Sequence, residues 1–310
     1  MINIMNVSKT YPQSKIKSLD SITVNIKDSS IMGLVGTNGA GKSTLLRILA
    51  GVYTPDCGDV IIDGHLVFEN SKLKQQISYL PDNHYFFKST TLNQMADFYK
   101  RFYPDFSYEY FGKLVSDFGL NPNRLLNTFS KGMLRQCEVI LALSSMPKYL
   151  LCDETFDGLD PLMRAYAKKE FMSYVAKTGA TVILSSHNLY DLEDLSDHIV
   201  LIDDGKVVID RSLDDIKENV FRYQMVLENP PTDFLPDDID ISSLTCRGKL
   251  YSFIAPGSAV QVEEKLRNYC LSNNCTITYF EPIHLTLDEI FCYELRDKGH
   301  ISFTGGDLNA

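Results

Sequence analysis

The sequence predicts an α/β fold with a mainly parallel sheet, followed by a smaller α+β unit. Three observations support this prediction. Strand-like and helix-like stretches alternate along most of residues 31–219, a glycine-rich loop separates an apolar strand from a helix at residues 36–44, and a proline- and acid-rich stretch at residues 229–238 interrupts the pattern. Such alternation is typical of a parallel sheet covered by helices.

Length and composition fit two ordinary globular domains. The chain has 310 residues, 44% of them hydrophobic and 23% charged, a balance that favours packed cores over disorder. We expect one domain over residues 1–219 and a small accessory domain over residues 220–310. The apolar runs are much shorter than the roughly 18 to 20 residues that cross a bilayer, so the chain is not expected to span a membrane.

Charge and cysteine usage exclude two further classes of protein. The net charge is −10 and neither domain is basic, so no nucleic-acid partner is expected. The seven cysteines include no C-x-x-C pair, and the first residues lack the basic patch and apolar stretch of a secretion signal. The sequence therefore predicts a cytoplasmic protein with reduced thiols.

The first elements lead into the glycine-rich loop. Residues 1–30 alternate apolar and polar side chains, as half-exposed strands do. An apolar strand from Ile31 to Val35 runs directly into the loop. After the loop, the apolar residues of 45–49 fall on one helical face, and Gly51 is placed to end that helix.

The middle of the chain is helical and rich in aromatic residues. This pattern predicts a helical subdomain at about residues 84–146, with most rings in its core and some at an interface. Strand and helix patterns then resume at residues 149–152, 161–177 and 180–185, with a hairpin around 204–205. Beyond residue 238, two strand-like and two helix-like stretches predict the small α+β domain.

The loop carries the residues needed to hold nucleotide phosphates. It consists of Gly36, Thr37, Asn38, Gly39, Ala40, Gly41, Lys42, Ser43 and Thr44. Its glycines let backbone N–H groups converge on phosphate oxygens, and the helix that follows adds its positive end. Lys42 supplies a charge to the β- and γ-phosphates, and the Ser43 hydroxyl is a predicted Mg²⁺ ligand. Because no guanine-reading Asn-Lys-x-Asp string occurs, the spacing predicts an ATP-driven P-loop protein.

Two adjacent acids follow another apolar strand. Asp153 and Glu154 come directly after residues 149–152. We expect Asp153 to hold Mg²⁺, directly or through water, and Glu154 to polarise the attacking water. Paired acids after a strand also occur as a simple helix N-cap region, but the glycine loop upstream favours the catalytic interpretation.

With these two motifs, the chain resembles the nucleotide-binding subunits of ABC transporters over roughly residues 1–218. Residues 36–44 match the Walker A loop of that family and residues 149–154 match Walker B. Four further matches occur in the family's order: Tyr11 at the adenine-stacking position, Phe129-Ser130-Lys131-Gly132-Met133 at the signature, Gly158-Leu159-Asp160-Pro161 at the D-loop, and Ser185-Ser186-His187 at the switch histidine.

The resemblance implies a fold, ligands and partners. It implies a P-loop NTPase domain with a RecA-like core and a mixed sheet, which binds ATP and Mg²⁺. Two such subunits, identical or different, would close face to face around two ATP molecules, with Ser130 and Gly132 serving the γ-phosphate held by the other subunit and Asp160 at the same interface. His187 would contact the γ-phosphate and hold the attacking water. A separate integral membrane subunit would place the chain on the inner face of the cell membrane.

Two positions depart from the family pattern. Asp82 stands where most members carry glutamine; its carboxylate suits Mg²⁺ or a water bound to it, so Asp82 is a third predicted metal ligand. Lys131 and Met133 replace Gly and Gln of the signature, as in an export-type branch that resembles bacterial antibiotic and peptide exporters. Residues 220–310 resemble the C-terminal extension of that branch.

We therefore interpret the chain as the energising ATPase subunit of an export-type ABC transporter. One alternative is a soluble ABC ATPase acting on ribosomes or DNA, although such proteins usually join two ATPase modules or insert coiled coils or zinc modules, which this sequence lacks. The other is a switch that closes on ATP and hardly hydrolyses it, as Asp82 and the altered signature suggest.

Overall fold

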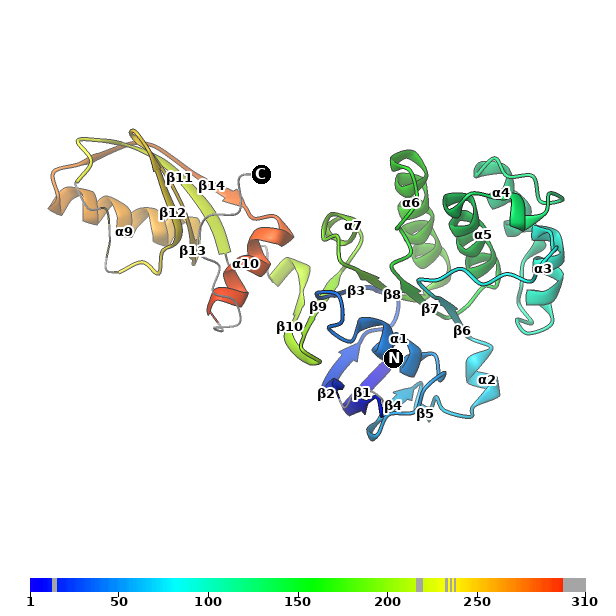
Figure 1. The fold of residues 1–310 in the computed structure, drawn as a ribbon. Helices are drawn as coiled ribbons and strands as arrows, with labels where there is room; N and C mark the ends of the chain where they lie inside the picture. The colour runs from blue at the N-terminus through cyan, green and yellow to red at the C-terminus, as the bar shows by residue number, and fades with distance from the viewer. Residues whose placement is uncertain (13–15, 216–219, 232–233, 235, 237, 298–310) are drawn as a thin grey trace. The chain divides into compact units, whose positions relative to one another are not determined.

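The computed structural model describes residues 1–12, 16–215, 220–231, 234, 236 and 238–297 (Figure 1). They divide into two compact units, Met1–Asp210 and Arg211–Ala310. The division lies in strand β10, whereas the sequence places a domain boundary after residue 219; residues 298–310 of the predicted second domain lie outside the described part.

A six-stranded sheet organises the first unit. Its order is β10 (Lys206–Ser212), β9 (His198–Asp203), β3 (Ile31–Val35), β8 (Thr181–Ser186), β7 (Tyr149–Asp153) and β6 (Ile77–Leu80). β3 pairs in parallel with β8 and β9, and β7 pairs in parallel with β6 and β8, which confirms the predicted α/β class. Every residue of β3, β7 and β8 is buried, as in sheets covered on both faces.

A second sheet of the same unit is antiparallel. Its order is β2 (Lys17–Ile26), β1 (Ile2–Thr10), β4 (Cys57–Ile62) and β5 (His65–Leu66). Buried and exposed side chains alternate along the second half of β2, which confirms the half-exposed strand predicted there.

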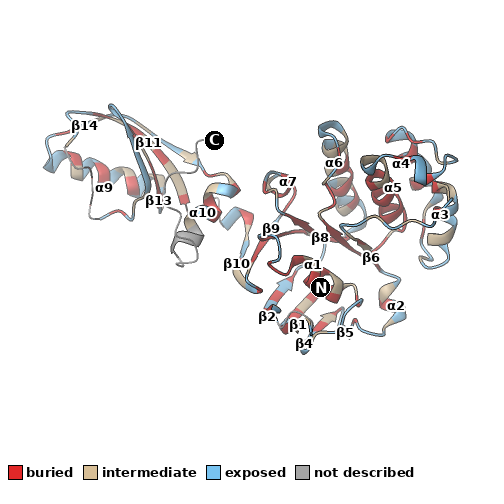
Figure 2. Cartoon of the chain, in the orientation of Figure 1, coloured by how far each residue is buried: buried red, intermediate tan, exposed pale blue. Residues whose placement is uncertain are grey.

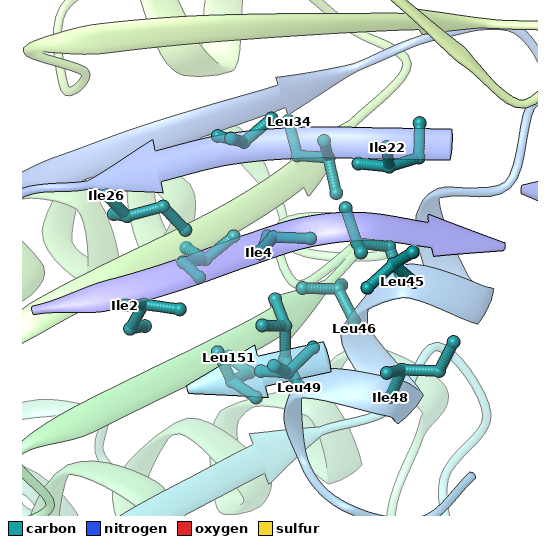
Figure 3. Packing of buried hydrophobic residues seen from close by; sticks show 14 of the residues in the cluster. Ile2, Ile4, Ile22, Ile26, Leu34, Leu45, Leu46, Ile48, Leu49 and Leu151 are labelled. Atoms are coloured by element: carbon teal, nitrogen blue, oxygen red, sulfur yellow. The ribbon is translucent and has the colours of Figure 1, made fainter. Parts of the chain in front are cut away.

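Helix α1 (Lys42–Leu49) packs between the two sheets. Its Leu45, Leu46, Ile48 and Leu49 join one hydrophobic cluster with residues of both sheets, such as Ile4 of β1 and Leu151 of β7 (Figure 3). This packing holds the helix that follows the glycine-rich loop in a fixed place, and with it the loop itself.

Helices cover the rest of the parallel sheet. They are α2 (Ser71–Lys74), α6 (Pro161–Thr178) and α7 (Tyr190–Glu193), with α3 (Leu92–Lys100), α4 (Tyr108–Asp117) and α5 (Lys131–Ser144) in the predicted helical segment. α5 is buried along most of its length (Figure 2). The aromatic residues of this segment divide: Phe106 and Phe111 are buried, whereas Tyr85 and Phe102 are 78% and 54% exposed.

The second unit is an α+β domain, the class that the sequence predicts for this part of the chain, and β11 is its first strand. Its antiparallel sheet has the order β12 (Ser242–Arg247), β13 (Leu250–Pro256), β11 (Val220–Glu228) and β14 (Thr276–His284), accompanied by α9 (Ala259–Ser272) and α10 (Leu287–Asp297). Tyr223, Phe253 and Leu266 belong to a core of its own. In the ranges that the structure describes, no helix is both long enough and apolar enough to cross a membrane.

Candidate active site

The glycine-rich loop connects β3 to α1. Gly41 directly precedes the helix with a φ of +112°, and a Cβ there would lie 2.4 Å from the carbonyl oxygen of Ser18, so only glycine fits. No side chain among the described residues caps α1. The first N–H groups of the helix are therefore left for an anion.

Lys42 is buried inside this loop. Its Nζ donates to the carbonyl oxygen of Gly36 at 2.7 Å and to that of Thr37 at 3.3 Å. The same Nζ lies 3.6 Å from Oε1 of Glu154. The ammonium group thus sits at the centre of the loop, beside the acids that follow β7.

Asp153 is fully buried at the end of β7, and hydroxyl groups satisfy its carboxylate. Oδ1 accepts from Ser43 Oγ at 3.1 Å and from Ser185 Oγ at 2.8 Å, and Oδ2 accepts from the Tyr79 hydroxyl at 3.4 Å. Burial and the neighbouring Asp153 raise the pKa of Tyr79 to about 12, so its hydroxyl remains a donor. Ser43 and Asp153 bring oxygen ligands together, which is the ligand chemistry that Mg²⁺ prefers.

Glu154 is held in an unusual backbone conformation beside Asp153. Its φ is +48°, and its N–H donates to the carbonyl oxygen and to Oγ of Ser185, at 3.2 and 3.1 Å. Its Oε2 accepts from the ring Nδ1 of His187 at 2.9 Å and from the backbone N–H of His187 at 3.3 Å. The two residues assigned to catalysis from the sequence are therefore in direct contact.

The imidazole of His187 lies between two carboxylates. The hydrogen bond to Glu154 is the main cause that raises the pKa of His187 above its usual value. Oδ2 of Asp157 lies 3.9 Å from the same Nδ1, and burial, followed by the charge of Glu154, raises the pKa of Asp157. Asp157 was not among the residues assigned from the sequence; the turn after β7 brings it to His187.

Tyr11 lies beside the loop and Asp82 faces elsewhere. The Tyr11 hydroxyl is 3.1 Å from Oγ1 of Thr44, and its ring meets that of Tyr53 edge-on. The carbonyl oxygen of Asp82 accepts from Arg135 at 2.5 Å, and its half-exposed carboxylate lies 3.9 Å from the same guanidinium. Within the described residues no hydrogen bond joins Asp82 to Ser43 or Asp153, so its metal role stays a prediction.

The signature segment and the D-loop pack against each other. Ser130 caps α5 by accepting from the N–H of Met133 at 3.2 Å, and Asp160 caps α6 by accepting from two N–H groups at 3.0 Å. A Cβ on Gly132 would lie 2.6 Å from the carbonyl oxygen of Gly158. Through this backbone contact the first turn of α5 rests on the segment that leads from Glu154 to Asp160.

Comparison with known proteins agrees with this geometry. Residues 19–157 match the model of the ABC transporter family. The chain is 27% identical over 267 residues to the ABC transporter ATP-binding protein YtrB of Bacillus subtilis (strain 168), covering 86% of this chain and 90% of the relative. It is 31% identical over 212 residues to the lipopolysaccharide export system ATP-binding protein LptB of Haemophilus influenzae, covering 66% and 87%.

A solved structure, that of an ATP-binding subunit of an ABC transporter, superposes with a TM-score of 0.64. It is 27% identical and covers 70% of this chain and 92% of its own. The α/β core and helical segment described above are therefore shared with a protein of that description.

The contact between Glu154 and His187 predicts a measurable pKa shift. In Glu154→Gln the negative acceptor of the Nδ1–H group is lost, so the pKa of His187 should fall toward its ordinary value of about 6.5. NMR titration of the histidine side chains measures this. An unchanged pKa of His187 would show that the two side chains are not paired in solution.

Two glycine-to-alanine substitutions should change the free energy of unfolding in opposite directions, because Gly132 touches Gly158 and Gly112 has open space around it. Gly132→Ala forces a Cβ against a backbone carbonyl and should lower the free energy of unfolding by about 1–3 kcal/mol. Gly112→Ala, in the exposed middle of α4 with open space around it, should raise it by about 0.5–1 kcal/mol. Denaturant unfolding followed by circular dichroism compares the two; equal effects would contradict the packing.

Proposed function

The chain belongs to the ATP-binding proteins of the ABC transporter family, and from this premise we propose that it energises an exporter by closing face to face with a second ATPase subunit. It is an ATPase, and the observation that supports the proposal best is the cluster of Lys42, Asp153, Glu154 and His187. These side chains come from three different elements and meet at one edge of the parallel sheet.

Each of these groups has a distinct role toward ATP. Lys42 and the N–H groups at the start of α1 bind the β- and γ-phosphates, for which Lys42 exchanges its contacts with Gly36 and Thr37. Ser43 and Asp153 would hold Mg²⁺, which when bound would neutralise charge on the phosphate oxygens. Glu154 orients the attacking water and accepts its proton, and His187 contacts the γ-phosphate. The ring of Tyr11 stacks on the adenine.

The signature segment supplies the other half of the site to a second subunit. Ser130 and Lys131 are exposed at the start of α5, where the helix dipole is positive. The Ser130 hydroxyl keeps its proton as a donor while its oxygen caps the helix. These groups suit the γ-phosphate held by a partner subunit, and loss of that phosphate lets the pair open.

A groove beside α3 suits a segment of a membrane-spanning partner. It encloses about 540 Å³ and is lined by aromatic and cationic residues, among them Lys74, Phe98, Arg101 and Phe102. The ring of Phe102 is half exposed there, and an exposed aromatic ring in a groove is typical of a protein-binding surface. A docked partner would place the chain on the cytoplasmic face of the membrane.

A slow ATP-gated switch is the second candidate. Two observations favour it: the Asp82 carboxylate lies 3.9 Å from the Arg135 guanidinium, and both carboxylate oxygens of Glu154 have partners. Single-turnover measurements separate the two functions, because a switch binds ATP stoichiometrically and forms no product over hours.

Substitution of Glu154 tests the catalytic assignment. Glu154→Gln should lower kcat for ATP hydrolysis by about 10² or more and trap an ATP-bound dimer, since the base is lost while the phosphate contacts remain. Phosphate release and size-exclusion chromatography measure both effects. Glu109→Gln, an exposed acid on α4, is the matched control. A Glu154→Gln protein that hydrolyses ATP normally would remove Glu154 from the mechanism.

Purification from membranes tests the transport assignment. The tagged chain should co-purify with an integral membrane protein. The variant Phe102→Asp, which places a charge in the groove, should lose that membrane protein on purification and still bind ATP. Mass spectrometry identifies the partner. Recovery with ribosomes and no membrane protein would instead support the non-transport alternative.

A further inference from the structure

Both carboxylate oxygens of Glu154 already have partners, and donors and cations beside a carboxylate make it a weaker base. Its Oε2 accepts from two donors of His187, at 2.9 and 3.3 Å, and its Oε1 lies 3.6 Å from the Nζ of Lys42. The side chain is only 13% exposed. This carboxylate becomes a stronger base toward a water molecule when it exchanges at least one of these partners.

ATP itself releases one of these partners but not the other. Anionic phosphates attract Lys42 away from Oε1 of Glu154, since they carry more charge than one carboxylate. The His187 side chain is 51% exposed here, but a second subunit closing over ATP would remove water as its acceptor, and an Nδ1–H group left without an acceptor in that desolvated site costs free energy. The release of Oε2 therefore requires another acceptor for the imidazole.

Asp157 is placed to be that acceptor. Its Oδ2 lies 3.9 Å from Nδ1 of His187, and one ligand atom from each of Glu154, Asp157 and His187 lies within 4.8 Å of the others. The N–H of Asp157 donates to the carbonyl oxygen of Glu154 at 3.1 Å, so the turn brings both carboxylates to the same imidazole. The Asp157 side chain is 43% exposed, which leaves it room to move.

We propose that Asp157 is a positioning residue for ATP hydrolysis, which accepts the Nδ1–H hydrogen bond of His187 when Glu154 turns toward the attacking water. No proton is transferred in this step; one hydrogen bond changes its acceptor. The opposite ring nitrogen of His187 stays directed at the γ-phosphate throughout. This inference rests on the catalytic roles proposed above for Glu154 and His187.

The charges around His187 set the expected pH dependence. Glu154 and Asp157 raise the pKa of His187, and Lys42 lowers it. Removing the charge of Asp157 therefore lowers this pKa. If the imidazolium form serves the γ-phosphate, activity is present below this pKa and lost above it, so the alkaline limb of the kcat profile moves to lower pH.

Substitutions of Asp157 in the full chain test the proposal. Asp157→Ala should lower kcat by about 10-fold, less than the roughly 10²-fold that misplacing a catalytic group can cost, with KM for ATP nearly unchanged. Its alkaline limb should move to lower pH. Asp157→Asn, which keeps an oxygen acceptor, should recover part of kcat but not the pH profile. Asp59→Ala, an exposed acid of β4, is the matched control.

A double substitution shows whether Asp157 acts through His187. In single-turnover hydrolysis, His187→Ala combined with Asp157→Ala should be no slower than His187→Ala alone, because the group being positioned is already absent. Additive losses would overturn the proposal. Thermal unfolding of each variant checks the fold, and if Asp157→Ala does not fold, the pH profile of the isosteric Asp157→Asn decides.

The outcomes separate this inference from the proposed function. An Asp157→Ala protein with the parent kcat and pH profile, while Glu154→Gln is inactive, would overturn the role of Asp157 and leave the proposed mechanism standing. Normal hydrolysis by Glu154→Gln would overturn the proposed mechanism, and the role of Asp157 with it.

Discussion

A fully buried carboxylate, that of Asp153, is the constraint on which the site depends. A charge removed from water is tolerated only when its lone pairs find donors, and here three hydroxyl groups provide them. Ser43 comes from α1, Ser185 from β8 and Tyr79 from β6. The hydrogen bonds that this one carboxylate needs therefore connect the phosphate loop to three neighbouring strands of the sheet.

The carboxylate next in the chain, that of Glu154, has different partners. Glu154 follows Asp153 in a left-handed backbone conformation, which turns its side chain toward Lys42 and His187 instead of into the sheet. In this arrangement the proposed general base is paired with Lys42 and His187, the groups that we propose bind the phosphates. Anionic phosphates bound at the loop would compete with Glu154 for Lys42 and so redistribute these contacts.

The surface that we propose serves a second subunit lies on other elements of the same unit. The first turn of α5 presents Ser130 and Lys131 to solvent, while Gly132 brings the helix against the backbone at Gly158. A change at Glu154 is thus one short segment away from the surface proposed to meet a second subunit. In the proposed mechanism, the segment from Glu154 to Asp160 would therefore carry a change at Glu154 to the first turn of α5.

The sequence by itself determined the parts that depend on local spacing. The loop from Gly36 to Thr44 and the two acids after β7 follow from backbone conformation and helix ends over a few residues. The tertiary structure alone decided which hydroxyls reach Asp153, since the parallel register that sets Asp153 beside Ser185 joins strands distant in sequence. The same holds for Asp157 beside His187 and for Asp82 beside Arg135. The distances within these three pairs depend on strand register and helix packing between segments far apart in the chain. The spacing of neighbouring residues does not determine them.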